Sequence, residues 1–241
     1  MRPRKVWFGD VVRFALFTRY RQIRGVARVP LMVRRSFTTV LLDLNCSPEA
    51  LLASCAANCR NEIRRGDKEE LTFRAGPPIA RDVEFFAAFM ALRGIGRVNM
   101  AYLSDPSALV TSVYSGDERL ASHLYLMPPG TGRARLIYSA TSAPADASDA
   151  GTRKPSSKVG AISNRWLHYQ DALFLQEHGA RLCDLGGLGG EGADSKIEGI
   201  NRFKRSFGGI EVTESNYDPL LLAVVDAALK RLGRLAMRLR R

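Results

Sequence analysis

Residues 183–209 read CDLGGLGGEGADSKIEGINRFKRSFGG, and this stretch decides the fold. Double glycines at 186–187 and 208–209 enclose the pair Phe203-Lys204. So much glycine close to a lysine is typical of a nucleotide-binding loop, of a set of tight turns, or of the floor of a transferase active site. These interpretations predict different proteins, and the spacing of the residues separates them.

The nucleotide motifs fit poorly. Residues 187–192 have the G-x-G-x-x-G spacing of the dinucleotide fingerprint and follow a predicted strand. That motif also needs a helix opening at its third glycine and a second parallel strand, but residues 193–195 are interpreted as a loop. A P-loop is excluded because Lys204 is not preceded by Gly-x-x-x-x-Gly, and Arg205 occupies the place of the required Ser or Thr.

Hydrophobic periodicity predicts an α+β chain in which antiparallel strands come first and one helix then crosses over to a further strand. The expected strands are 36–45, 70–75, 109–114, 119–127, 133–142, 180–185 and 209–214, and the expected helices are 48–66, 82–94, 163–178 and one that starts at 218. The loop at 143–160 is too long for a plain connector, and we expect it to act as a lid.

The positive charge lies at the two ends of the chain. The formal net charge is +12; residues 1–36 hold ten Lys/Arg and one acid, and residues 230–241 hold six Lys/Arg and no acid. Basic ends bind polyanions such as RNA, an acidic membrane face or phosphate-bearing substrates, and a merely solvated charged surface is the open alternative.

The remaining composition favours a reduced, cytoplasmic environment. There is no run of 18 apolar residues and no secretory signal, so we expect a cytoplasmic protein, peripheral to the inner face of the membrane if its basic ends bind there. The four cysteines are too irregular for a disulfide framework, and no histidine near Cys55 and Cys59 completes a zinc site. We therefore expect buried thiols and no metal.

Two short motifs in the second half of the chain resemble those of a known family. The strand ending in Asp-Leu-Gly-Gly at 184–187, followed by Phe-Lys-x-x-Phe-Gly-Gly at 203–209, resembles the FemABX-type aminoacyltransferases, which have the GNAT-like acyltransferase fold. Segment 59–66 is similar to the basic helix that opens their catalytic half. The resemblance covers 37–215. It implies a GNAT-like α+β fold, with a mixed, mostly antiparallel central sheet flanked by helices.

The resemblance also implies how the chain is divided into domains, and the chain departs from the family pattern in two respects. It implies a GNAT-like domain at 37–218 between a basic N-terminal segment, 1–36, and a basic amphipathic C-terminal helix, 219–241. Family members usually carry two such modules, whereas this chain has room for one. Residues 157–163 match poorly the glycine-rich turn with which CoA-using relatives hold pyrophosphate, which weakens CoA as a donor.

Acyl transfer to an amine needs a polarised carbonyl, a deprotonated amine and a stabilised oxyanion. The resemblance implies that Lys204 clamps a phosphate or the oxyanion; a surface lysine beside packed phenylalanines is the alternative. Asp184 either orients or deprotonates the amine or caps the glycine turn. Gly186 and Gly187 either offer N–H groups to the oxyanion or only make the turn. His123, in mid-strand, either takes the amine proton at the mouth of the site or is a hydrogen-bonded structural residue.

The donor side of the site is predicted from charge. Arg153, Lys154 and Lys158 lie in the expected lid and should approach a donor phosphate, and Arg205 is a further candidate for that contact. No bound cofactor is expected: the donor substrate is aminoacyl-tRNA or acyl-CoA, and a tRNA would use the basic ends.

We therefore expect an acyl- or aminoacyltransferase that modifies an amine of a cell-envelope or polysaccharide precursor. Two alternatives stay open: an acyl-CoA-dependent N-acetyltransferase of the GNAT type, and a non-catalytic module that binds RNA or an acidic membrane. The Phe-Lys-x-x-Phe-Gly-Gly element favours an enzyme, because a pure binding module does not need it.

Overall fold

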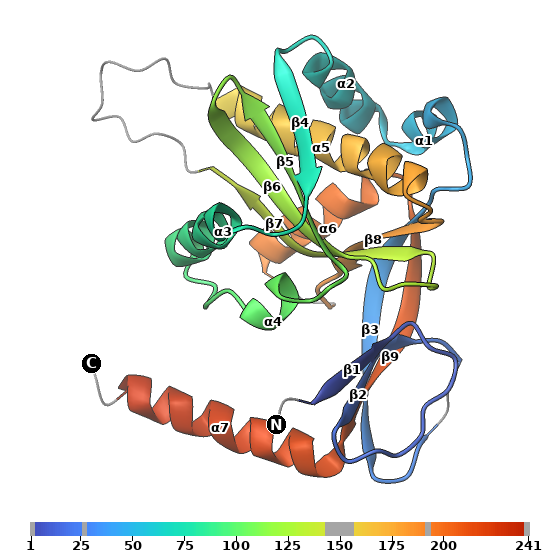
Figure 1. The fold of residues 1–241 in the computed structure, drawn as a ribbon, viewed down its shortest axis with the longest axis vertical. Helices are drawn as coiled ribbons and strands as arrows, with labels where there is room; N and C mark the ends of the chain where they lie inside the picture. Colours follow the sequence, from blue (N-terminus) through green and yellow to red (C-terminus); the bar gives the residue numbers. More distant parts are fainter. Residues whose placement is uncertain (1–2, 26–27, 143–156, 191–193, 239–241) are drawn as a thin grey trace. The chain divides into compact units, whose positions relative to one another are not determined.

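The structure, a computed structural model, describes residues 3–25, 28–142, 157–190 and 194–238. The chain forms two compact units, which we call the central unit (Val40–Ile210) and the terminal unit (Met1–Thr39 with Glu211–Arg241). The strands β3 (Met32–Asp43) and β9 (Ile210–Pro219) run from one unit into the other (Figure 1).

The central unit is built on a mixed sheet with the strand order β3-β8-β7-β6-β5-β4. Its strands are β4 (Leu71–Gly76), β5 (Ala108–Ser115), β6 (Glu118–Leu126), β7 (Arg133–Thr141) and β8 (Leu182–Gly187). β4 to β7 form an antiparallel meander, whereas β7 and β8 are parallel and are joined by the crossover helix α5 (Ser157–Glu177). This is the predicted α+β topology.

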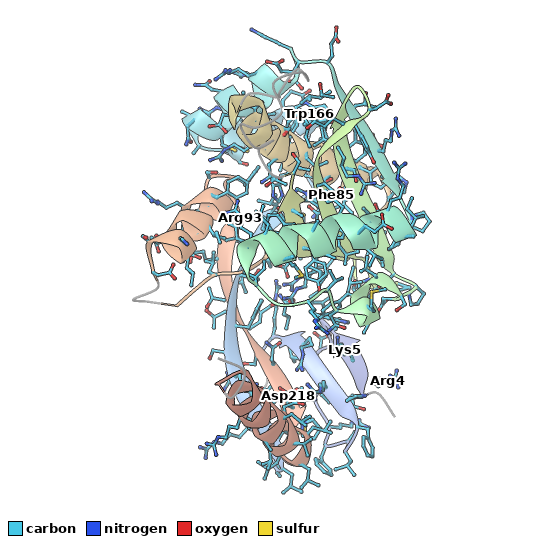
Figure 2. The ribbon with its side chains drawn as sticks, turned by 90° about the vertical axis from the view of Figure 1, so that its left-hand side faces the viewer. Arg4, Lys5, Phe85, Arg93, Trp166 and Asp218 are labelled. Atoms are coloured by element: carbon cyan, nitrogen blue, oxygen red, sulfur yellow. The ribbon has the colours of Figure 1, made fainter. Side chains whose placement is uncertain are left out.

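Helices cover both faces of this sheet (Figure 1). On β6, His123 contacts α5, and its neighbour Leu124 packs with Phe86 of α3 (Ala80–Arg93), because successive strand residues point to opposite faces. The helix α2 (Ala57–Gly66) packs beside α5. Trp166 of α5 (Figure 2) donates from Nε1 to Oδ1 of Asp67, the residue that follows α2, at 2.8 Å. The other helices of this unit are α1 (Pro48–Ser54), α4 (Met100–Leu103) and α6 (Ser195–Arg205).

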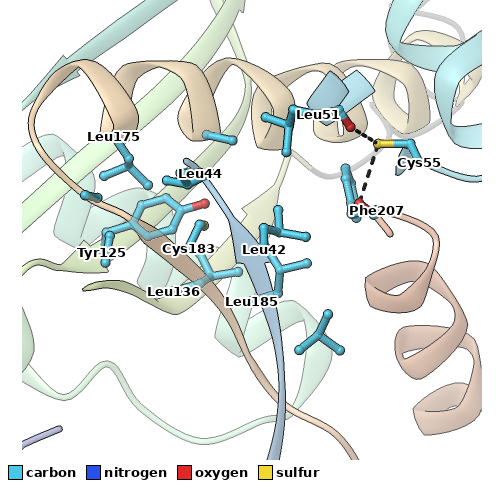
Figure 3. Close-up of a cluster of buried hydrophobic side chains, with 14 of the residues drawn as sticks. Leu42, Leu44, Leu51, Cys55, Tyr125, Leu136, Leu175, Cys183, Leu185 and Phe207 are labelled. Atoms are coloured by element: carbon cyan, nitrogen blue, oxygen red, sulfur yellow. Dashed lines mark hydrogen bonds between the residues drawn. The ribbon is translucent and has the colours of Figure 1, made fainter. Parts of the chain in front are cut away.

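The main core lies between β3, β7, β8 and α5 (Figure 3). It contains the large buried side chains Leu42, Leu44, Tyr125, Leu136, Leu175 and Leu185. Cys55 and Cys183 belong to the same cluster, and Cys55 Sγ donates to the carbonyl oxygens of Leu51 and Phe207, both at 3.6 Å. All four cysteines are free, as the sequence predicts for thiols without a disulfide framework.

The double glycine at 208–209 has a packing role. Gly208 has φ +79°, and a Cβ placed there would lie 2.1 Å from the carbonyl oxygen of Ser54. The Ala56 N–H nearby donates to Ser206 O at 2.8 Å. Gly208 therefore lets the backbone after α6 pass against the end of α1, and Gly209, where a Cβ would lie 2.6 Å from Leu41 O, lets it pass against β3.

Three local predictions were wrong. The expected helix 48–66 is two helices, because the Ala56 N–H bonds to Ser206 O and Cys55 adopts an extended backbone. Ser195, which was predicted to lie in a loop, is the first residue of α6, and Asp194 Oδ1 caps this helix by accepting from Lys196 N and Ile197 N. The basic segment 1–36, for which no element was predicted, contains two strands and the start of β3.

The terminal unit combines both ends of the chain. It contains β1 (Arg4–Trp7) and β2 (Thr18–Ile23), which are parallel, and the outer parts of β9 and β3. Its small core contains Val12, Tyr20, Ile23 and Tyr217. The chain then enters α7 (Leu220–Arg238). No helix in the described part of the chain is both long and apolar enough to span a membrane.

Candidate active site

The strands β7 and β8 separate at the place where the predicted site residues meet. Their parallel ladder joins Arg133 to Leu182 and ends, within the described residues, at the pair Arg135–Asp184, although both strands continue beyond it. β8 finishes with the first double glycine. Diverging parallel strands leave backbone groups without a ladder partner, so this part of the sheet is suited to receive a substrate.

The first double glycine makes a sharp turn. Gly186 has φ +80°, and a Cβ there would lie 3.3 Å from Leu136 O and 3.5 Å from Lys204 Nζ. Its N–H donates to Asp184 Oδ1 at 2.8 Å, so Asp184 caps the turn, as one of the two sequence interpretations held. The Gly186 N–H is thus already bonded in this state.

Asp184 is fully buried and paired. Its Oδ2 accepts from Arg133 Nη2 at 2.6 Å, and its Oδ1 accepts from Gly186 N. A buried carboxylate whose two oxygens both have partners is held rigidly. This arrangement suits the positioning of the turn better than the removal of a proton from an amine.

Lys204 reaches this turn from the last turn of α6. Its Nζ donates to Gly187 O at 2.6 Å. Burial, with a smaller contribution from the nearby Arg135, lowers the pKa of Lys204 to about 8 against the attraction of Asp184. A solvated surface lysine does not fit this position, and the structure brings Lys204, Asp184 and both glycines together.

His123 does not lie at the mouth of a site. Its side chain is fully buried; Nδ1 lies 2.5 Å from Asp171 Oδ2, and Nε2 lies 3.0 Å from Asn164 Oδ1. The hydroxyl of Tyr125 also donates to Asp171 Oδ2, at 2.9 Å. Of the two interpretations of His123, the hydrogen-bonded structural residue fits the structure and a proton acceptor at the mouth of the site does not, because the strand face that carries His123 is covered by α5.

A second buried histidine, His168, was not identified from the sequence. The His168 ring of α5 lies against the His123 ring, with centroids 4.1 Å apart and planes tilted by 38°, and it also contacts Phe203 at 5.3 Å and Phe207 at 5.0 Å. Burial, followed by the charges of His123, Lys204 and Arg165, holds the pKa of His168 well below its usual range, so the ring is neutral at pH 7.

The sequence did hold a signal for His168. Asn164, His168 and Asp171 recur at intervals of four and three residues, which places them on one side of an otherwise apolar helix. A polar stripe on a buried helix indicates a hydrogen-bonded network or a site inside the fold.

The same group contains donors that could hold a metal ion. One donor atom from each of His123, His168 and Asp171 lies within 4.8 Å of the others, and all three residues are buried. His168 Nδ1 and Asp171 Oδ1 have no hydrogen-bond partner within the described part of the chain. However, Asp171 Oδ2 is already hydrogen-bonded to His123 Nδ1 and to the Tyr125 hydroxyl, and His123 Nε2 is bonded to Asn164 Oδ1, so the arrangement fits a hydrogen-bonded network better than a metal centre.

Among the basic residues predicted to bind the donor, the structure describes the side chain of Arg205 alone. Arg153 and Lys154 lie outside the described residues, as does most of the expected lid, and Lys158 is in the first turn of α5. Arg205 is exposed and forms an ion pair with Glu198 at 3.4 Å. Arg205 therefore does not share the environment of its neighbour Lys204.

Other arginines line a hollow beside α6. Arg165 Nε binds Glu62 Oε2 at 2.6 Å, its Nη1 donates to Ser206 Oγ at 2.5 Å, and its guanidinium lies 4.7 Å from the Phe203 ring centroid. The hollow has a volume of about 350 Å³ and is lined by Asn58, Arg165, Gly199, Arg202, Phe203 and Ser206. Two guanidinium groups and a hydroxyl suit an anionic group.

Comparisons with known proteins identify the fold. No family model and no curated protein matches the chain. The chain is similar to the crystal structure of FemX, with a TM-score of 0.57 and 14% identity over 79% of this chain, and it spans 63% of FemX, less than two thirds of its length.

Two further solved structures are similar. L-PGS from Bacillus licheniformis has a TM-score of 0.53 and 13% identity, covering 89% of this chain and 72% of that chain. The C-terminal domain of a putative lysylphosphatidylglycerol synthetase from Agrobacterium fabrum has a TM-score of 0.52 and 17% identity, covering 88% and 72%. The predicted FemABX-type, GNAT-like fold is confirmed; identities this low show the fold alone.

Proposed function

We propose that the chain transfers an acyl or aminoacyl group to an amine of a cell-envelope or polysaccharide precursor. The observation that carries this proposal is the position of Lys204, whose ammonium group is held against Gly187 O where β7 and β8 separate. A partly desolvated cation beside a glycine turn is suited to bind charge that develops during transfer. The similarity to FemX and to structures named for lysylphosphatidylglycerol synthesis supports a reaction of this class.

In this reaction the amine nitrogen bonds to the donor carbonyl carbon, the ester or thioester bond breaks, and the amine proton ends on the leaving group. Lys204 would exchange Gly187 O for the oxyanion or for a donor phosphate. Asp184 and Arg133 would fix the turn on which this exchange depends. Neutral His168, packed against Phe203, would position the last turn of α6.

The donor is proposed to be polyanionic. Aminoacyl-tRNA and acyl-CoA both carry phosphates, and the hollow with Arg165 and Arg202 offers cations next to Phe203, one residue from Lys204. The poor match of residues 157–163 to a pyrophosphate turn favours aminoacyl-tRNA. Transfer from acyl-CoA, as in GNAT N-acetyltransferases, is the second candidate.

The test is a donor panel. Charged tRNAs and acyl-CoAs are offered to the full chain with an amino-sugar acceptor, and product is measured for wild type, Lys204→Ala and the control Lys196→Ala, an exposed lysine of the same helix. We expect one donor class to react and Lys204→Ala to lose about 10²–10³ in rate, with Lys196→Ala unchanged. Full activity of Lys204→Ala would refute the role of the lysine, and failure of both donor classes would refute the function.

A further inference from the structure

The helix α7 shows an unusual distribution of side chains. Its inward side carries the buried Ala223 and the partly buried Asp226, which binds Arg19 Nη1 at 2.9 Å. Its outward side carries large aliphatic residues that are 46–64% exposed: Leu220, Leu221, Val224, Val225 and Leu229. These positions recur at one- and four-residue intervals and form one continuous apolar face. We call this set the outward face of α7.

More exposed apolar side chains belong to the same unit. The segment between β1 and β2 exposes Val11, Phe14, Leu16 and Phe17, and Leu31, whose carbonyl accepts from Leu220 N at 2.9 Å, is also exposed. Of the seventeen large hydrophobic side chains that are exposed among the described residues, ten lie in the terminal unit, which holds the smaller part of the chain. Exposed apolar surface of this extent marks an interaction site.

The terminal unit also carries nearly all of the net charge. Residues 1–39 hold ten Lys/Arg against one acid, and residues 211–241 hold six against four, so this unit has a formal charge of +11 out of +12. Two of its acids are buried against arginines: Asp218 Oδ1 lies 2.6 Å from Arg21 Nη2, and Glu214 Oε1 lies 3.0 Å from Arg24 Nε. The charge that the unit presents to solvent is therefore strongly positive.

We propose that the terminal unit docks on an anionic membrane, with the outward face of α7 entering the lipid interface and the Lys and Arg of this unit binding lipid headgroups. The combination of an exposed aliphatic helix face with a basic surface is what an interfacial helix requires. RNA would use the charge and leave the aliphatic side chains in water. A second copy of the chain would cover them only by bringing two units of charge +11 together.

The surface is tested by sedimentation of the full chain with vesicles of phosphatidylcholine and phosphatidylglycerol in equal parts, and with vesicles of phosphatidylcholine alone. The variant is Leu221→Glu with Val225→Glu. The matched control is Leu92→Glu with Ile95→Glu, two comparably exposed residues at the end of α3 in the central unit. Because all four side chains are exposed, thermal melts of both variants should match wild type.

We expect wild type to bind the anionic vesicles, to release them at high salt, and to bind neutral vesicles at least about tenfold more weakly. The α7 variant should lose about tenfold or more in affinity, and the α3 control should bind like wild type. Equal binding by the α7 variant and wild type overturns the proposal. So does a wild-type dimer in light scattering that the α7 variant converts to a monomer, or binding to a structured RNA without binding to vesicles.

Discussion

Lys204→Met is expected to make the protein more stable while removing transfer. The native environment lowers the pKa of Lys204 from 10.5 to about 8, chiefly by burial. One pKa unit corresponds to about 1.4 kcal/mol, so holding the charged form costs at most about 3 kcal/mol. Methionine fills a similar volume without a charge but loses the hydrogen bond to Gly187 O, which contributes about 1 kcal/mol. The free energy of unfolding at pH 7 should therefore rise by about 2 kcal/mol.

The pH dependence separates this effect from ordinary packing. Because the folded pKa of Lys204 lies below the unfolded value, the unfolded chain binds more protons between about pH 8 and 10.5. The free energy of unfolding of wild type therefore rises as the pH increases from about 8 to 10.5, and it receives no such contribution below about pH 8. Lys204→Met cannot gain it, so the difference between the two proteins should shrink toward pH 10.

The assay is urea denaturation of wild type and Lys204→Met at several pH values from 7 to 10. Lys196→Met, an exposed position of the same helix, serves as the control and should follow wild type. The reasoning is refuted if Lys204→Met is no more stable than wild type at pH 7, or if the difference between them is constant across the range.

Three further predictions follow from named contacts. Gly208→Ala should lower stability by more than about 3 kcal/mol in urea denaturation, because its Cβ meets Ser54 O and its φ is positive; a neutral effect would contradict the close approach. Asp171→Asn should lower stability by about 3 kcal/mol because it removes a buried carboxylate that His123 Nδ1 and the Tyr125 hydroxyl contact, and a loss below about 1 kcal/mol would contradict this role. Transfer should decline above about pH 8 as Lys204 loses its proton, and Lys204→Arg, where active, should keep its rate to higher pH.

Much of the fold could be predicted from local pattern. Alternating residues place the strands of the meander, and the helical stretch before Gly179 predicts the crossover that makes β7 and β8 parallel. The split of residues 48–66 could not be predicted, because the hydrogen bond that interrupts the helix comes from Ser206, far along the chain. The strands β1 and β2 were missed because arginines interrupt their apolar pattern.

The site was predictable where it is continuous in sequence. Asp184 and its glycines form one strand end, and Lys204 follows in a recognisable element, so their proximity could be expected. His168 could not be assigned in the same way, because its importance comes from three partners on different elements: His123 on β6, Phe203 on α6 and Phe207 beyond it. The polar stripe of Asn164, His168 and Asp171 on α5 indicates a buried network, but it does not identify the partners of His168 on the other elements.

The two units differ strongly in net charge. The basic ends are separated by almost the whole sequence, yet β9 lies between β2 and β3 and brings them into one unit of charge +11. The central unit, with the candidate active site, is left with a net charge of +1, so its arginines are largely balanced by acids. In the docking proposed above, long-range attraction to an anionic surface therefore acts on the terminal unit, whereas the proposed substrate binding at the site uses short contacts such as those of Lys204 and Arg165. Raising the salt concentration should accordingly weaken the binding of the full chain to anionic vesicles.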